Sequence, residues 1–333
     1  MWQVIGQDRI LSLLDYSLKA NAIAHAYLIV GPRHVGKGTL AMNLAQALNC
    51  DGPELPCGQC RSCRRILEGK HADVTSVGLD SRTEIGIDDI RGLQHLANLP
   101  PYEGKCKVFI IDDAEYLSTE AANSLLKILE EPPPRVVWLL LAAEEERLLP
   151  TTISRCQRLE LKPVPSERVQ EVLVHLYKVD AHKAKLLARL CHGRLGWALS
   201  VLANDDILEQ RSQRIAKLSS LLVASLEQRF TYAQELANQF SQSRKAGAEM
   251  LEMWLDWWRD VMLIKGGCQE AIINVDYETT LAEQARGLSL SEIESFLTGL
   301  GLLQVEISKN VNPRLAWERL MLNLPREKLS AKS

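Results

Sequence analysis

The sequence predicts an α/β domain built on a parallel sheet, followed by a small helical lid and a longer all-helical region. Within the first 165 residues, short apolar runs alternate with stretches of helical periodicity, which is typical of a parallel sheet with helices on both faces. Beyond about Pro165 strand-like runs largely disappear and helical patterns take over. A chain of 333 residues also exceeds one ordinary core, so we expect two or three domains.

The elements of the first half follow in a regular order. Each predicted strand is a short apolar run, the first ending in glycine and the second in carboxylates. The third predicted helix has start signals at Ser118 or Thr119 and is stopped by three prolines. The predicted helices span residues 9–23, 39–50 and 118–131, and the predicted strands span residues 26–31, 107–115 and 136–143.

The second half contains one strongly apolar helical pattern. Core packing between helices is the favoured interpretation of its tryptophans, and a surface for stacking nucleic-acid bases is the alternative. The residues that share one helical face are Leu251, Trp254, Leu255, Trp258 and Met262.

Composition and charge narrow the class of protein. A hydrophobic content of 46% with 24% charged residues is ordinary for a soluble globular protein. The net charge of -3 argues against a protein coated by nucleic acid, so any DNA contact should be local. The first residues do not read as a signal peptide, and the longest apolar run, residues 136–143, is too short to span a bilayer. We therefore expect a cytoplasmic protein that does not bind membranes.

The stretch GPRHVGKGT, residues 31–39, is nearly a phosphate-binding loop. A glycine-rich turn between a strand and a helix directs backbone N–H groups at phosphates, so Gly31, Gly36 and Lys37 are candidate nucleotide-binding residues. The hydroxyl that normally ligates Mg²⁺ after the lysine is missing, because Gly38 stands there. Thr39 is one residue further along the chain and roughly 100° around the helix, so its hydroxyl should point elsewhere. The alternative is a glycine-rich turn that binds no ligand. Lys37 stands at the position expected of the lysine of a phosphate-binding loop, which argues against that alternative.

Beyond Gly38, two further parts of a hydrolysis site are weakened, although the acid that organises Mg²⁺ is retained. Asp112, at the end of the second strand, occupies the place of the acid that organises Mg²⁺. Asp113 follows where a water-activating glutamate is usual, and Glu115 is expected to point away from the direction of Asp113. Ala142 and Ala143 stand where a polar side chain would orient the water. The sequence thus predicts a loop that does not turn over efficiently.

Four cysteines form a C-x6-C-x2-C-x2-C pattern: Cys50, Cys57, Cys60 and Cys63. Four closely spaced thiolates are typical of a closed, structural zinc site, with free thiols or an iron–sulfur cluster as alternatives. His71 lies nearby in sequence but is surplus to four ligands. The remaining cysteines are interpreted as ordinary buried or partly buried thiols: Cys106, Cys156, Cys191 and Cys268.

Taken together, these motifs resemble the clamp-loader subunits of the bacterial replicative DNA polymerase III, within the AAA+ superfamily. The resemblance runs essentially end to end, and its most specific part is the pair formed by SLLKILEEPP and SRC. The segments that carry it are residues 5–7, 25–41, 50–63, 121–133, 154–156 and 312–318.

Two subunit types of this family share the layout, the ATPase motor (gamma/tau) and the stator (delta-prime). Motors carry serine or threonine where this chain has Gly38, glutamate where it has Asp113, and an arginine where it has Gly196. Arg194 is two positions away and is not credited as a substitute. The chain resembles delta-prime, a subunit that does not turn over ATP.

The resemblance implies a role for Arg155 of the SRC motif as an arginine finger given in trans to a neighbouring ATPase subunit. From the residue alone, a surface arginine paired with a local acid is the alternative. The implied partners are gamma/tau and delta subunits in a hetero-oligomeric ring, with the sliding clamp and primer–template DNA reached through the assembly. The implied cofactor is structural zinc, and ATP or ADP with Mg²⁺ is left open.

The resemblance also implies a domain organisation: an AAA+ domain at residues 1–165 with a zinc module at 50–70, a helical lid at 166–205, and an oligomerising helical collar at 206–330. Two rival functions remain. One is an active ATPase of the gamma/tau type or another AAA+ protein, which Lys37 and Asp112 keep open. The other is a purely structural module that uses neither nucleotide nor finger.

Overall fold

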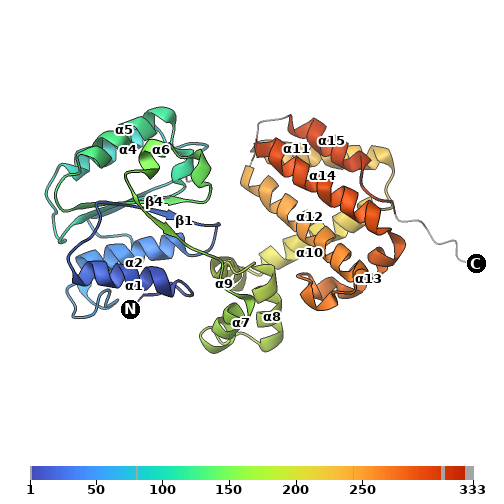
Figure 1. Ribbon diagram of the computed structural model, residues 1–333, viewed down its shortest axis with the longest axis horizontal. Helices are drawn as coiled ribbons and strands as arrows, with labels where there is room; N and C mark the ends of the chain where they lie inside the picture. Colours follow the sequence, from blue (N-terminus) through green and yellow to red (C-terminus); the bar gives the residue numbers. More distant parts are fainter. Residues whose placement is uncertain (1, 80–81, 243, 309–311, 327–333) are drawn as a thin grey trace, which may run out of the picture. The chain divides into compact units, whose positions relative to one another are not determined.

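The computed structural model describes residues 2–79, 82–242, 244–308 and 312–326 (Figure 1). The chain forms two compact units, Met1–Leu176 with Cys191–Leu199, and Tyr177–Leu190 with Ser200–Ser333. Among the described residues, no helix combines the length and the apolar character needed to cross a membrane. The end of the predicted collar, residues 327–330, lies outside the described residues.

The first unit is built on a five-stranded sheet in the order β2-β3-β4-β1-β5, and every pairing in it is parallel. The central strands β1, β3 and β4 are buried along their whole length, because helices cover both faces of the sheet. The strands are β1 Ala26–Val30, β2 Val74–Val77, β3 Lys107–Ile111, β4 Val136–Ala142 and β5 Gln157–Glu160. The predicted parallel α/β class is confirmed.

Alternate residues of the central strands β1, β3 and β4 contribute to two separate cores. On one face, side chains such as Phe109, Trp138 and Leu140 pack with those of α4 (Ile87–Ala97) and α5 (Thr119–Glu130). On the other face, the side chains pack with those of α1 (Asp8–Lys19) and α2 (Lys37–Asn49). Figure 1 shows these two pairs of helices on opposite sides of the sheet.

The second unit is helical in its described residues and has a core of its own. The side chains fully buried in it include Trp254, Trp257 and Trp258 of α12 (Arg244–Lys265) and Trp317 of α15 (Pro313–Leu322). Core packing is therefore confirmed for the predicted tryptophans, and base stacking by them is excluded. Trp257, which lies off the predicted face, donates from Nε1 to Gln284 Oε1 at 2.8 Å.

The remaining α-helices complete the description. They are α3 Arg61–Leu67, α6 Pro150–Ile153, α7 Ser166–His175, α8 Ala181–Leu190, α9 Leu195–Ala203, α10 Asp206–Leu221, α11 Leu226–Gln242, α12 Arg244–Lys265, α13 Glu278–Gly287, α14 Leu290–Ser308 and α15 Pro313–Leu322. The helices of the predicted lid, α7 to α9, are shared between the two units. The predicted domain boundaries therefore stay a prediction.

Candidate functional site

The phosphate loop connects β1 to α2 at the carboxyl end of the sheet. Gly36 precedes α2 with a φ of 111°, a left-handed conformation that favours glycine. Gly31 has a φ of 148°, and a Cβ on it would lie 2.5 Å from the carbonyl oxygen of Leu161. Both glycines are therefore required by the backbone path, whether or not the loop holds a ligand.

The ammonium group of Lys37 is already engaged by the loop. Its Nζ donates to the carbonyl oxygens of Gly31, at 2.7 Å, and of Pro32, at 3.1 Å. Gly38 faces open space, with no atom within 4 Å of a Cβ built there, so a serine or threonine would fit sterically. Thr39 is exposed. The missing hydroxyl is thus a chemical difference and not a consequence of crowding.

Three carboxylates follow β3 and bring negative charge to the loop. The Asp113 backbone is left-handed, with a φ of 54°, and its carboxylate pairs with Arg33 of the loop at 3.2 Å. Asp112 accepts a hydrogen bond from the Asp113 amide. Glu115 is buried, and its Oε1 accepts a hydrogen bond from the Ala143 amide, at the end of β4, at 3.0 Å.

The charges of this group act on one another. Burial lowers the pKa of Lys37, while Glu115 and Asp112 oppose that effect. Burial also raises the pKa of Asp112, and Asp113 adds to the rise. Burial is the largest single influence on the pKa of Arg33 and tends to lower it, but Asp113, Tyr116 and Glu115 together outweigh burial and raise the pKa. The cations of the loop therefore face carboxylates of the chain itself, in the region where a phosphate-binding loop holds a nucleotide.

Glu115 belongs to this charged group, which the sequence did not predict. A carboxylate two residues beyond Asp113 was expected to point away, but the short 3₁₀ helix Ala114–Tyr116 follows the left-handed Asp113 and turns the chain. Its other oxygen, Oε2, is buried and accepts no hydrogen bond from the described residues. Only the tertiary contact with the Ala143 amide shows that Glu115 belongs to the site.

Gly196 packs directly on the phosphate loop. Its amide donates to the carbonyl oxygen of His34 at 2.9 Å, and a Cβ built on it would lie 2.7 Å from that oxygen. Any side chain here would force the backbone apart. Arg194 Nε donates instead to the Cys191 carbonyl oxygen at 3.0 Å. The residues present thus fit a phosphate-binding backbone, but lack both the Mg²⁺-ligating hydroxyl and an arginine at position 196.

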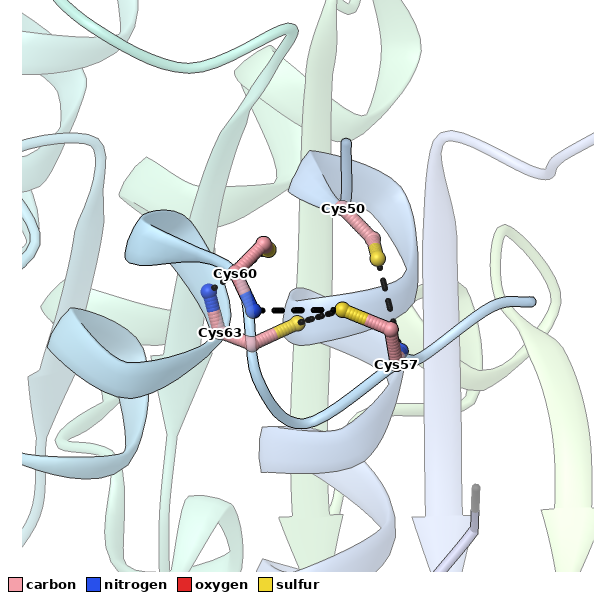
Figure 2. A group of neighbouring side chains, drawn as sticks. All are labelled: Cys50, Cys57, Cys60 and Cys63. Carbon is pink, nitrogen blue, oxygen red and sulfur yellow. Dashed lines mark hydrogen bonds between the residues drawn. The ribbon is translucent and has the colours of Figure 1, made fainter. Parts of the chain in front are cut away.

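The four predicted cysteines converge between α2 and α3 (Figure 2). Cys50 ends α2, Cys60 caps α3, and Cys63 lies in the first turn of α3. All four sulfurs lie within 4.8 Å of one another, and those of Cys57 and Cys63 are 4.0 Å apart. Sulfurs bound at about 2.3 Å to one tetrahedral zinc would be about 3.8 Å apart. The cluster therefore fits a closed four-sulfur metal site.

Backbone amides favour the thiolate form of Cys57, whereas burial raises the pKa values of Cys50 and Cys63. The amides of Gln59 and Cys60 point at the Cys57 sulfur, and those hydrogen bonds, that of Cys60 first, lower the pKa of Cys57 to about 6. The amide of Cys63 donates in turn to the Cys60 sulfur at 3.4 Å. Since the thiolate is the form that binds metal, this arrangement supports a metal site.

The other cysteines and His71 stand apart from this cluster. Among the described residues, the four cysteines alone form a group close enough to hold a metal, and His71 is not part of it. Burial raises the pKa of Cys106 to about 11 and that of Cys156 to about 12, as expected of buried thiols. Cys268 is an exception, because it is exposed in the loop after α12 and not buried as predicted.

Arg155 lies just after α6 and is half-exposed. Its Nη1 donates to the carbonyl oxygen of Thr151 at 2.9 Å, and its Nη2 donates to Glu130 Oε1 at 2.7 Å. The local ion pair considered from the sequence is therefore present. It leaves a third of the side-chain surface of Arg155, 34%, exposed to solvent.

Comparisons with known proteins agree with one another. A family model described as DNA polymerase III, delta subunit, matches residues 6–165, and one described as its C-terminal part matches residues 205–326. The chain is 30% identical to the DNA polymerase III subunit delta' of Bacillus subtilis over 319 residues, covering 96% of each. It is 29% identical to the tau subunit of the same organism, covering 95% of this chain and 59% of tau.

Among solved structures, a gamma subunit-related protein of Thermotoga maritima matches 95% of this chain and 99% of its own, at 21% identity and a TM-score of 0.41. The match to subunit delta' extends over nearly the full length of both chains, and the two family models cover the α/β and the helical parts. The chain therefore belongs to the delta-prime subunit family of DNA polymerase III.

Proposed function

We propose that this chain is the stator of a clamp loader, a subunit that helps load the sliding clamp on primed DNA without turning over ATP itself. The observation that carries the proposal is the state of the phosphate loop. Lys37 is retained but bonded to the loop, Gly38 offers no hydroxyl, and Gly196 leaves no room for an arginine. The loop keeps its fold while lacking groups that hydrolysis requires.

The catalytic contribution of the chain is then Arg155, supplied to the ATP of a neighbouring motor subunit. A guanidinium suits this task because it is planar, always charged and able to donate two parallel hydrogen bonds. Neutralising charge on the transferred phosphoryl group can raise the rate by about 10³–10⁵. The half-exposed position of Arg155 supports a role at a surface.

The partners follow from the same family. We propose that the chain joins gamma/tau and delta subunits in a ring through its helical collar, residues 206–330. The sliding clamp and primer–template DNA are then reached through the assembly. Zinc in the four-cysteine cluster would stabilise residues 50–70, because it ties the end of α2 to the start of α3.

Steady-state ATP hydrolysis by the purified chain tests the first part of the proposal. With Mg²⁺, primed DNA and clamp present, the wild type should be as inactive as Lys37→Ala. A wild-type rate well above that control would identify an active ATPase instead, and the weight given to Gly38, Asp113 and Gly196 would be wrong.

A reconstituted loader tests the finger. Motor subunits whose own SRC arginines are changed to alanine leave Arg155 as the sole finger. In that loader, Arg155→Ala should lower ATP hydrolysis by about 10³-fold, toward the background of the motors alone. An unchanged rate would support the purely structural alternative.

A further inference from the structure

The two most specific segments of the sequence, SLLKILEEPP and SRC, meet in one ion pair. Glu130 is the last residue of α5, and Arg155 follows α6, which begins at Pro150. We propose that Glu130 is a positioning residue that holds the Arg155 guanidinium in the orientation in which it meets a phosphoryl group of the neighbouring subunit. This inference rests on the proposed role of Arg155 as a finger.

The guanidinium is fixed at two of its nitrogens by two separate segments. Nη1 is bonded to the Thr151 carbonyl oxygen at 2.9 Å, and Nη2 to the Glu130 carboxylate at 2.7 Å. The hydroxyl of Ser154 donates to the same Thr151 carbonyl at 3.1 Å. Two anchors at different nitrogens set both the direction and the rotation of a planar group, which one anchor alone could not do.

The two hydrogen bonds leave the Arg155 guanidinium able to bind a phosphate. A guanidinium carries five N–H donors, and two hydrogen bonds leave the others free for an incoming phosphate. The Arg155 and Glu130 side chains keep 34% and 53% of their surface exposed, so a neighbouring subunit can reach the pair. The carboxylate is a stronger acceptor than a neutral oxygen, which explains an acid at this position.

The energetic role of the pair is orientation and not stability. An ion pair this exposed contributes little to folding, because water screens it. A free arginine side chain has many rotamers, however, and ordering it when the phosphate arrives lowers the rate of the catalysed step. By holding the Arg155 side chain beforehand, Glu130 removes part of that entropic cost. Glu130 itself does not contact the phosphate and acts only through Arg155.

The test uses the loader in which Arg155 is the sole finger. We expect Glu130→Ala to lower kcat for ATP hydrolysis by about threefold to tenfold, with little change in KM. Glu130→Gln, whose amide oxygen can still accept from Nη2, should restore most of the rate. Glu131→Ala is the matched control, since Glu131 is exposed, adjacent and unpaired with Arg155 among the described residues. The thermal unfolding of all three variants should match the wild type.

A double variant separates positioning from any independent role. Arg155→Ala with Glu130→Ala should be no slower than Arg155→Ala alone, because Glu130 acts through that arginine. A Glu130→Ala loader as fast as the Glu131→Ala loader, or faster than wild type, would overturn the inference while leaving the finger intact, provided that Arg155→Ala is slow. If Arg155→Ala itself has no effect, the proposed function fails and the inference fails with it.

Discussion

The carboxylate of Glu115 is buried close enough to Lys37 to act on its pKa, with one oxygen bonded to the Ala143 amide. Its other oxygen accepts no hydrogen bond from the described residues. Burial first, and the nearby charge of Asp113, raise the pKa of Glu115 above its ordinary value. Holding this carboxylate ionised therefore costs folding free energy, which the positive charges of Lys37 and Arg33 offset only in part.

This side chain should give the protein a measurable dependence of stability on pH. A carboxyl group whose pKa is raised by folding stabilises the folded state at low pH, and that stability is lost as pH rises through the folded pKa. We expect the free energy of unfolding of the wild type, relative to Glu115→Gln, to fall as pH rises above about 4.3, the ordinary glutamate value. Urea titrations of both proteins between pH 4.5 and 8 measure this difference in the free energy of unfolding.

The control for that titration is Glu146→Gln, which removes an exposed glutamate from the same unit. Its difference from wild type should stay flat over the same pH range. Asp112, Asp113, Lys37 and Arg33 face the same site and are unchanged in both variants, so a pH-dependent difference confined to Glu115→Gln reports Glu115 together with its effect on these neighbours. A flat difference for Glu115→Gln as well would show that Glu115 titrates alike in the folded and unfolded chain.

At the scale of single elements, a strand could be predicted from the sequence where its residues are buried along its whole length. Strands β1, β3 and β4 are buried along their length, so they appear in the sequence as continuous apolar runs. Strands β2 and β5 lie at the sheet edges and are short, and β5 reads QRLE with one buried residue in four. Their strand character comes from pairing with β3 and β1, which periodicity cannot show.

The candidate site shows the same division between local and tertiary information. The cysteine cluster was predictable because its four ligands lie within fourteen residues and their spacing is itself the signal. The contact of Gly196 with His34 and the pair of Arg155 with Glu130 join distant residues. A single sequence contains no periodicity or spacing that reveals such contacts, so only the structure identifies them.

The segment that joins α2 to α3 should depend on its metal. Between Cys50 and Cys60 the chain has no helix or strand, and the sulfurs with their amide donors are its main internal contacts. Outside the cluster, Gln46 Nε2 donates to the Cys63 carbonyl oxygen at 2.9 Å and ties α3 to α2. A bound zinc would link four points of this segment at once.

We expect Cys57→Ser, or chelation of the wild type, to remove zinc and to raise amide hydrogen exchange in residues 50–67. Strand β1 should keep its protection, because its neighbours β4 and β5 are unaffected. Cys268→Ser, which changes an exposed thiol, is the matched control and should retain full zinc and full protection. Full protection of residues 50–67 in Cys57→Ser would mean that the segment is ordered without metal.

At the scale of the whole molecule, each compact unit has its own hydrophobic core, so each should respond to perturbations placed within it. In the second unit, the guanidinium of Arg229 is fully buried with no acid partner in the described residues. It donates instead to four backbone carbonyls, of Leu221, Leu222, Leu324 and Pro325. It thereby ties the end of α10 to the segment after α15.

Arg229→Met should therefore destabilise the second unit by about 3 kcal/mol, because it leaves buried carbonyls without donors. At an ordinary urea dependence, this lowers the midpoint of unfolding by about 1 to 2 M.

Hydrogen exchange at increasing urea, read peptide by peptide, should show that shift in the second unit and not in the first. Cys57→Ser should raise exchange in residues 50–67 of the first unit and leave the second unit unshifted, and Arg314→Met, at an exposed arginine, should shift neither unit. Because the two changes act on separate cores, their effects should add in the double variant. Equal shifts of both units with either variant would show that the chain unfolds as a single cooperative body.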